Sequence, residues 1–236
     1  MSAGNTGAVM AFSLLTLGML KGVKRPALAA FFPTKKGFTL VLDVGANADC
    51  KPLHLFQFGV MGSLYVSNVL SIENPKVGLL SLGEESSKGK ELTTQAFLLL
   101  KEGCPNFSGS IEGCTILDGK ADVVVCDGFV GNAILKFGES VFSMAMEELR
   151  REAGRSSLTR FGALLLAPAL RSLVSRMSYE EYGGAPLLGV DGVSVVCHGR
   201  SGPRAIKSAI WAAKRFCEEK VNERISERLE WSERGD

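Results

Sequence analysis

The sequence predicts an α/β protein with a mostly parallel sheet that is flanked by helices. Three observations support this fold class. Short apolar runs alternate with longer amphipathic stretches, which is the pattern of strands connected through helices. Three of these runs, ending at Val44, Leu82 and Cys126, lead through loops of small and polar residues into helical patterns. The 236 residues are also 46% hydrophobic, which is enough for a sizeable buried core.

Composition and charge exclude several classes of protein. A formal net charge of +2 gives no global case for nucleic-acid binding. None of the six cysteines has Cys-x-x-Cys spacing, and several lie within apolar runs. We therefore expect reduced, buried thiols in a cytoplasmic protein, with no metal site, no cofactor and no nucleic-acid partner.

The first predicted element is a helix in the apolar stretch at 8–20. This stretch is shorter than the roughly 20 residues of a membrane-spanning helix, and its basic residues follow it, unlike those of a signal peptide. Asn5, Thr6 and Gly7 before it are suited to an N-cap, and Gly22 after it to a C-cap. The sequence therefore predicts a buried helix here.

The remaining elements follow from apolar periodicity and from breaks at Gly, Pro and polar turns. Pro52 falls at the first turn of a helical pattern, a position where proline is tolerated. In order, we expect strands at 26–32 and 38–44, a helix at 52–70, a strand at 77–82, a helix at 92–101, strands at 107–111 and 121–126, a helix to about 151, a strand pair at 186–190 and 193–197, and one long amphipathic helix to about Leu229.

The stretch from Val77 to Thr93 has the layout of an anion site. A buried strand is followed by a loop in which Gly83 and Gly89 let the backbone approach a ligand and Lys88 brings positive charge. A helix begins after the loop, so its free N–H groups would point at the ligand. The spacing is not that of a P-loop. A solvated polar turn between strand and helix is the alternative.

Three further polar loops follow predicted strands, at 43–49, 127–132 and 198–203. Such strand ends meet at a common cleft in α/β folds, which is where these folds bind ligands. Lysine and backbone N–H groups can hold a phosphate, and an amide such as Asn132 can polarise or orient a carbonyl. Of the two histidines, His54 lies within a helix pattern, whereas His198 ends a strand and is the better candidate, with a capping or structural role as its alternative.

The segment at 150–178 is basic and apolar together. It contains six arginines and a single acidic residue, Glu152. The arginines flank the apolar stretch at 161–170, which we expect to bend like a hairpin at Pro168. An apolar tip with basic flanks suits the interface of an anionic membrane. A helix pair packed on a partner subunit or on the protein's own core is the alternative. The expected membrane contacts are Leu164, Leu165, Leu166 and Leu170.

Several motifs closely resemble the PlsX family of acyl-ACP:phosphate acyltransferases. They lie at 2–8, 42–52, 77–89, 120–132 and 182–189 and span almost the whole chain. The resemblance implies transfer of a long-chain acyl group from acyl carrier protein (ACP) to inorganic phosphate, at the start of phospholipid synthesis. It also implies a fold like isocitrate and isopropylmalate dehydrogenases and phosphotransacetylase, a homodimer, and peripheral attachment to the inner face of the plasma membrane.

The resemblance also implies the site residues. Phosphate would be held by Lys88 and the loop at 83–89 and would attack the thioester carbonyl, while Asn132 stabilises the developing oxyanion. The expected catalytic residues are Lys88, Asn132 and His198. The expected phosphate- or substrate-binding residues are Asn5, Thr6, Asp43, Asn47, Gly83, Glu84, Ser87, Gly89, Asp127 and Gly131.

One departure from the family concerns the start of the chain. PlsX-like chains carry a further segment, with a strand and a Gly-rich loop, before the position where this chain begins. We therefore expect residues 1–236 to form a partial, N-terminally truncated PlsX-like domain. The alternatives are a non-catalytic homologue that dimerises or binds ACP or membrane, and a decarboxylating dehydrogenase of the same fold.

Overall fold

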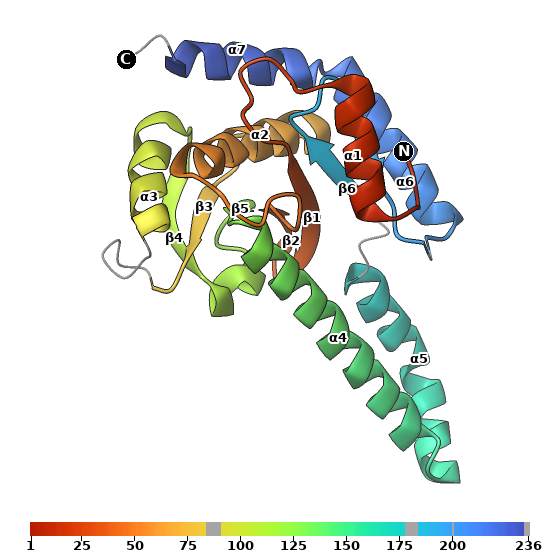
Figure 1. Ribbon diagram of the computed structural model, residues 1–236. Helices are drawn as coiled ribbons and strands as arrows, with labels where there is room; N and C mark the ends of the chain where they lie inside the picture. Colours follow the sequence, from red (N-terminus) through yellow and green to blue (C-terminus); the bar gives the residue numbers. More distant parts are fainter. Residues whose placement is uncertain (84–90, 178–183, 200, 234–236) are drawn as a thin grey trace.

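The computed structural model describes residues 1–83, 91–177, 184–199 and 201–233. Within them lies a seven-stranded sheet in the order β4-β3-β5-β2-β1-β6-β7 (Figure 1). The strands are β1 (Ala27–Thr34), β2 (Gly37–Leu42), β3 (Val77–Ser81), β4 (Phe107–Glu112), β5 (Val123–Val125), β6 (Ala185–Leu188) and β7 (Ser194–Val196). The helices are α1 (Thr6–Leu17), α2 (Pro52–Leu70), α3 (Glu91–Gly103), α4 (Gly128–Ala153), α5 (Ser157–Met177), α6 (Pro203–Glu218) and α7 (Val221–Glu233), with the 3-10 helix η2 (Gly113–Asp118).

The sheet is mixed, and its parallel strands form one half of it. Strand β5 is parallel to both β2 and β3, and β4 continues the parallel set. Strands β1, β6 and β7 are antiparallel to their neighbours. Leu42 and Leu79 both pair with Val125, so β2, β5 and β3 end side by side. The predicted α/β class with flanking helices is therefore confirmed, although its sheet has an antiparallel half.

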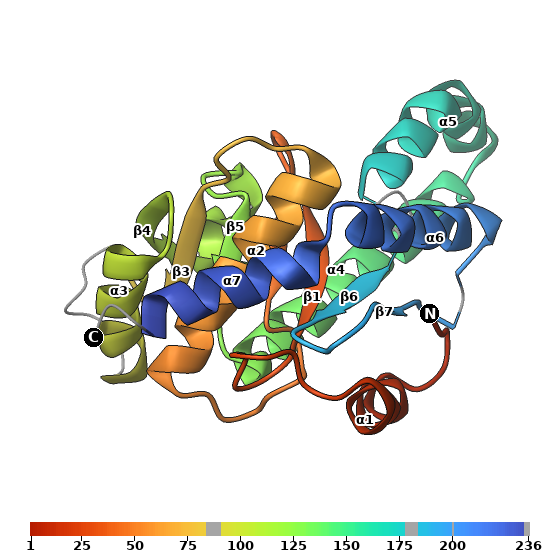
Figure 2. The ribbon, with the colours of Figure 1, turned by 90° about the horizontal axis from the view of Figure 1, so that it is seen from above.

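Helix α2 is the centre of the larger core. It is buried along most of its length, because one side packs on the sheet and the other is covered by further helices. Figure 2 shows α7 lying across α2, where it buries Val221, Ile225 and Leu229. Gly59 and Gly62 face neighbouring elements, and a Cβ at Gly62 would stand 2.7 Å from Leu42 Cδ1. Small residues thus let this helix approach the sheet closely.

The N-terminal helix is where we expect it, but its burial is not as predicted. It begins after the N-cap Asn5, whose side chain accepts a hydrogen bond from the Ala8 N–H group, and it ends at Leu17 with Gly18 as its C-cap, earlier than expected. Most of α1 is exposed. The expectation of a buried helix is therefore wrong. Nearly every face of α1 is apolar, so the sequence does not indicate that a single face meets the sheet.

The orientation of α1 is set by a buried polar contact. The hydroxyl groups of Ser13 and Ser194 lie 2.8 Å apart and are buried, so the serine side of the helix faces β7. Phe12 and Leu15 consequently point outward, with 70% and 87% of their surface exposed. The α1 face that contains Phe12 and Leu15 is therefore an uncovered apolar surface.

Two other predictions need correction. The single C-terminal helix is two helices, because Lys220 adopts a positive φ of 51° and redirects the chain between α6 and α7. The hairpin at 150–178 does reverse direction, but at 154–156 between α4 and α5, and not at Pro168, which lies inside α5. Figure 1 shows the α4–α5 hairpin projecting away from the sheet. None of the described helices is both long and apolar enough to cross a membrane.

The contact between α2 and the sheet can be tested with a pair of Gly→Ala variants. We expect Gly62→Ala to lower the free energy of unfolding by about 1–3 kcal/mol, because the new methyl group overpacks Leu42 and Val123. Gly138→Ala is the matched control in α4, where a Cβ meets nothing within 4 Å. It should raise the free energy of unfolding by about 0.5–1 kcal/mol. Urea unfolding of both variants measures the difference, and equal effects would contradict the packing described here.

Candidate functional site

The candidate site lies where three parallel strands end. Asp43 follows β2, Asp127 follows β5 within two residues, and Gly83 follows β3. The ends of β2 and β5 are joined by a backbone hydrogen bond, in which the Asp43 N–H group donates to Cys126 O at 2.9 Å. The polar loops at 43–49 and 127–132, which the sequence placed after separate strands, therefore meet at one edge of the sheet, which is the usual ligand-binding edge of α/β folds.

Asp43 organises the first of these loops. Its Oδ1 atom accepts hydrogen bonds from the N–H groups of Leu28, Gly45 and Ala46 at 2.9–3.1 Å. Its Oδ2 atom accepts from the backbone and side-chain nitrogens of Asn47 at 2.6 and 2.9 Å. Burial raises the pKa of the Asp43 carboxyl, and several of these donors oppose that rise. The carboxyl is completely buried, so it shapes the loop and presents no free surface to a substrate.

Asn47 joins this loop to the rest of the site. Its side-chain nitrogen also donates to Pro26 O at 2.7 Å, and its own backbone carbonyl accepts from the Gly128 N–H group at 2.9 Å. The side chain is almost fully buried. Of the residues expected to bind substrate, Asp43 and Asn47 are therefore placed as supports behind the site surface.

The N-terminus of α4 packs directly on the Asp43 loop. Its N-cap Asp127 accepts a hydrogen bond from the Val130 N–H group at 2.9 Å. A Cβ at Gly131 would overlap the backbone carbonyl of Asp43, and one at Gly128 would stand 2.5 Å from Asn47 O. Because only glycine fits these two contacts, the helix begins at a fixed position against the loop.

Asn132 is the side chain that this packing presents outward. It lies in the first turns of α4 and is exposed, with its side chain directly beside Gly45. A Cβ at Gly45 would meet Asn132 Cβ at 3.5 Å. The amide group therefore stands over the Asp43 loop at the joined strand ends, where it can donate a hydrogen bond to an oxygen of a bound substrate.

The third loop is only partly described. Gly83 is buried just beyond β3, and α3 begins at Glu91. Glu84, Ser87, Lys88 and Gly89 lie outside the described residues, so their predicted roles stay predictions. Because β3 pairs with β5, the chain leaves β3 on the same edge as Asp127 and enters α3 eight residues after Gly83.

Asn5, Thr6 and His198 form a second group beside β7. Ser2 N–H donates to Val195 O and Ser2 O accepts from Cys197 N–H, at 3.1 and 2.8 Å, so the first residues run alongside the end of β7. Strand β7 lies three strands away from β2, which is roughly 14 Å at about 4.8 Å per strand. The structure therefore does not bring His198 together with the Asp43 loop as the sequence interpretation expected.

Two cysteines lie behind the site. The Cys126 thiol donates to Asp43 O at 3.5 Å, and the Cys50 thiol approaches Asn47 O at 3.9 Å. Burial raises the pKa of Cys50 to about 11, so this thiol is protonated at neutral pH and is a poor nucleophile. Within the described residues, no group of three or more His, Cys, Asp or Glu side chains is placed to hold a metal ion.

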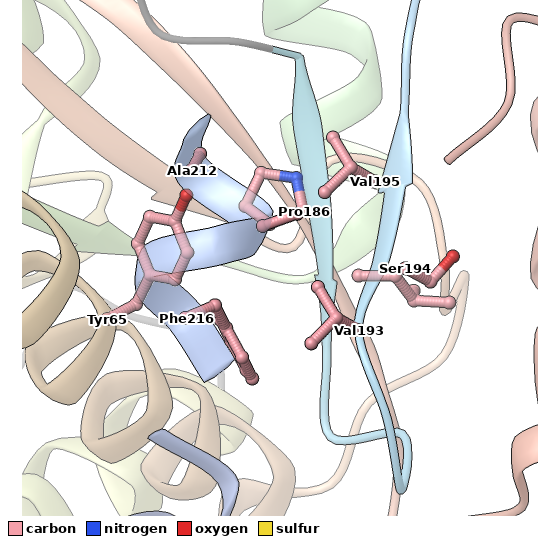
Figure 3. Close-up of a pocket in the computed structure, with 9 residues that line it drawn as sticks. Tyr65, Pro186, Val193, Ser194, Val195, Ala212 and Phe216 are labelled. Carbon is pink, nitrogen blue, oxygen red and sulfur yellow. The ribbon is translucent and has the colours of Figure 1, made fainter. Parts of the chain in front are cut away.

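A separate depression between α6 and the β6–β7 pair is not a ligand site. Figure 3 shows its apolar lining, which includes Tyr65 from α2, Val193 and Phe216. The space between these side chains is too narrow for a water molecule. It belongs to the core that joins α6 to the sheet.

Comparison with known proteins identifies the family. The sequence profile of the family described as "Fatty acid synthesis protein" matches residues 1–224. This chain belongs to that family. A phosphate acyltransferase from Pelotomaculum thermopropionicum is 49% identical over 229 residues, which is 97% of this chain and 67% of the relative. One from Alkaliphilus oremlandii is 51% identical over 226 residues, 96% of this chain and 68% of the relative.

These relatives confirm the resemblance to PlsX, and this chain spans about two thirds of their length.

Solved structures add a fold comparison. The EutD phosphotransacetylase from Staphylococcus aureus is similar with a TM-score of 0.56 at 15% identity, covering 91% of this chain and 60% of that chain. A phosphotransacetylase from Streptococcus pyogenes gives 0.53 at 17% identity, covering 90% and 60%. The predicted phosphotransacetylase-like fold is thus confirmed, whereas the likeness to dehydrogenases and the truncation stay predictions.

The role of Asp43 can be tested by stability. We expect Asp43→Ala to lower the free energy of unfolding by about 3–5 kcal/mol, because it leaves five N–H groups, three of them buried, without their acceptor. Asp118→Ala, which removes an exposed ion pair with Lys35, is the control and should have little effect. Urea unfolding measures both. A folded Asp43→Ala protein of unchanged stability would show that the carboxyl does not hold the loop.

Proposed function

We propose that this member of the fatty acid synthesis protein family is an acyltransferase that converts long-chain acyl-ACP and inorganic phosphate to acyl phosphate and ACP, in phospholipid synthesis. Family membership supports the reaction class. The structural observation behind it is the position of Asn132, exposed beside Gly45 where β2 and β5 end. An amide donor at this edge is suited to a substrate carbonyl that develops negative charge.

The proposed reaction needs no covalent enzyme intermediate. A phosphate oxygen attacks the thioester carbonyl carbon, the carbonyl oxygen becomes an oxyanion, and the C–S bond then breaks. The ACP thiolate leaves and takes up a proton. Asn132 donates to the oxyanion, while the predicted roles of Lys88 and the loop at 83–89 are to hold phosphate. Asp43, Asn47 and Gly131 act as positioning residues, because they fix the loop and the helix that present Asn132.

The proposed function is tested by release of the carrier-protein thiol from acyl-ACP. We expect release to require phosphate and to yield one acyl phosphate for each thiol. Release that is independent of phosphate would indicate a hydrolase and would contradict the proposal. No observation on the described residues favours a dehydrogenase or a non-catalytic homologue.

Asn132 gives the sharpest test of the site. We expect Asn132→Ala to lower kcat about 100-fold to 1000-fold, as does loss of an oxyanion donor in other acyl-transfer enzymes. Asn132→Asp keeps the shape but removes the NH₂ donor and adds charge, so it should be at least as impaired. Stability should change little, since Asn132 is exposed. Full activity of both variants would exclude Asn132 from the reaction.

We also propose that α5 attaches the protein peripherally to the inner face of the plasma membrane. Leu164, Leu165 and Leu166 are exposed on it, and Leu170 is half-buried. Exposed Arg160 and Arg171 lie on the same helix and can contact anionic lipid headgroups. Exposed apolar side chains on α1 and α4 support the further proposal of a homodimer in the cytoplasm.

Membrane attachment predicts a loss of vesicle binding on charge insertion. We expect the double variant Leu165→Asp, Leu166→Asp to float at least about tenfold less with vesicles that contain phosphatidylglycerol. Leu98→Asp in α3 is the control, because Leu98 is also exposed but lies outside the hairpin. Equal flotation of the wild type and the double variant would show that α5 does not bind the membrane.

A further inference from the structure

The outer surface of α6 contains a shallow groove next to the loop that precedes the helix. The groove has a volume of about 520 Å³ and is lined mainly by apolar atoms, from Ser201, Gly202, Pro203, Ile206, Lys207 and Ile210. Figures 1 and 2 place α6 at the outside of the molecule. Its inner side packs on β6 and β7 through Ala209, Ala212 and Phe216, as Figure 3 shows in part.

The residues beside the groove are basic. Between residues 203 and 217 there are four lysines and arginines and no acidic residue, so this surface is positive over four turns. Arg204 and Lys207 are exposed, and neither forms an ion pair with another residue that the structure describes. Both lie near the positive end of the helix dipole, where cations destabilise a helix. Helix stability therefore does not explain these two charges.

Apolar side chains lie between the charges. Ile210 and Trp211 are exposed by 56% and 51%, and Ile210 follows Lys207 by one turn on the outer face. The guanidinium of Arg215 lies 5.2 Å from the Trp211 ring centroid and also donates to Asn68 O at 3.0 Å. This contact restrains the indole ring next to Ile210 in the helix. An apolar centre with charged surroundings is the usual composition of a protein-binding surface.

We propose that this surface, from Pro203 to Lys214, docks the acidic carrier protein that delivers the acyl group. The partner that fits is a helix with carboxylates along its sides and an apolar residue between them. That residue would enter the groove at Ile206 and Ile210, while the carboxylates face Arg204, Lys207 and Lys214. This inference rests on the proposed function for the identity of the partner, but it assigns a surface separate from Asn132 and the Asp43 loop.

Charge complementarity favours a carrier protein over the other occupants. A second copy of this chain would place the same positive face against itself if the interface were symmetric about α6, and like charges repel. A membrane would be met by a continuous apolar strip such as that on α5, whereas the α6 surface is concave and has isolated apolar side chains. Steering by the positive face would also speed association with an acidic protein.

Binding of fluorescently labelled holo-ACP to the full chain tests the proposal without any catalytic step. We expect the double variant Arg204→Glu, Lys207→Glu to raise the Kd at least about tenfold at low salt. Ile210→Ser should raise it several-fold, because it removes the apolar centre. Binding by the wild type should weaken as salt increases, and the double variant should show a smaller dependence.

Matched controls separate docking from general effects of charge and polarity. Lys101→Glu in α3 reverses one charge away from α6, which is half the charge change of the double variant, and Leu98→Ser removes an apolar side chain that is 55% exposed, close to the value for Ile210. Both controls should bind holo-ACP like the wild type. Equal binding by Arg204→Glu, Lys207→Glu would overturn the proposal. So would α6 variants that lose only vesicle binding or only self-association.

A second acyl donor distinguishes failure of docking from failure of the proposed function. With an acyl thioester of N-acetylcysteamine, which has no carrier protein, the α6 variants should react with phosphate at the wild-type rate. With acyl-ACP their kcat/KM should fall about tenfold. If the wild type reacts with neither donor, the proposed function fails, while the binding measurement still decides whether the α6 surface docks ACP.

Discussion

The carboxyl group of Asp43 is the interaction on which the candidate site depends. It is fully buried at the end of β2, and five N–H groups converge on its two oxygens. Burying a carboxyl is costly unless its hydrogen bonds are satisfied, and here four donors come from the loop that the carboxyl shapes and one, Leu28, comes from the neighbouring strand β1. The loop conformation and the burial of Asp43 therefore require each other.

The second support is the close approach of α4 to that loop. Gly128 and Gly131 allow backbone contacts that any side chain would block, and Asp127 caps the same helix end. A helix that is fixed at its first turn presents Asn132 in one position beside Gly45. Preorganisation of this kind is how an enzyme obtains a large effect from a single amide donor.

The molecule combines this rigid edge with several uncovered surfaces. Helix α2 is enclosed on both sides, whereas α1, the α4–α5 hairpin and the outer side of α6 expose apolar residues. The exposed surfaces differ in chemistry, because α5 has a run of leucines with arginines and α6 has a groove with basic residues beside it. The proposed contacts with a membrane, a second subunit and an acidic substrate carrier would therefore use different surfaces.

The sequence by itself determined the α/β class, the helix at 52–70 and the family, because apolar periodicity, capping residues and long motifs are local signals. It also predicted that Asn132 and the Asp43 loop belong to the site, and this stays a prediction. Only the tertiary structure decided that Asp43 and Asn47 support the site from behind, that His198 lies across the sheet, and that α1 exposes Phe12. Those outcomes depend on strand order and on which helix face meets the sheet, and neither is encoded in the spacing of residues along the chain.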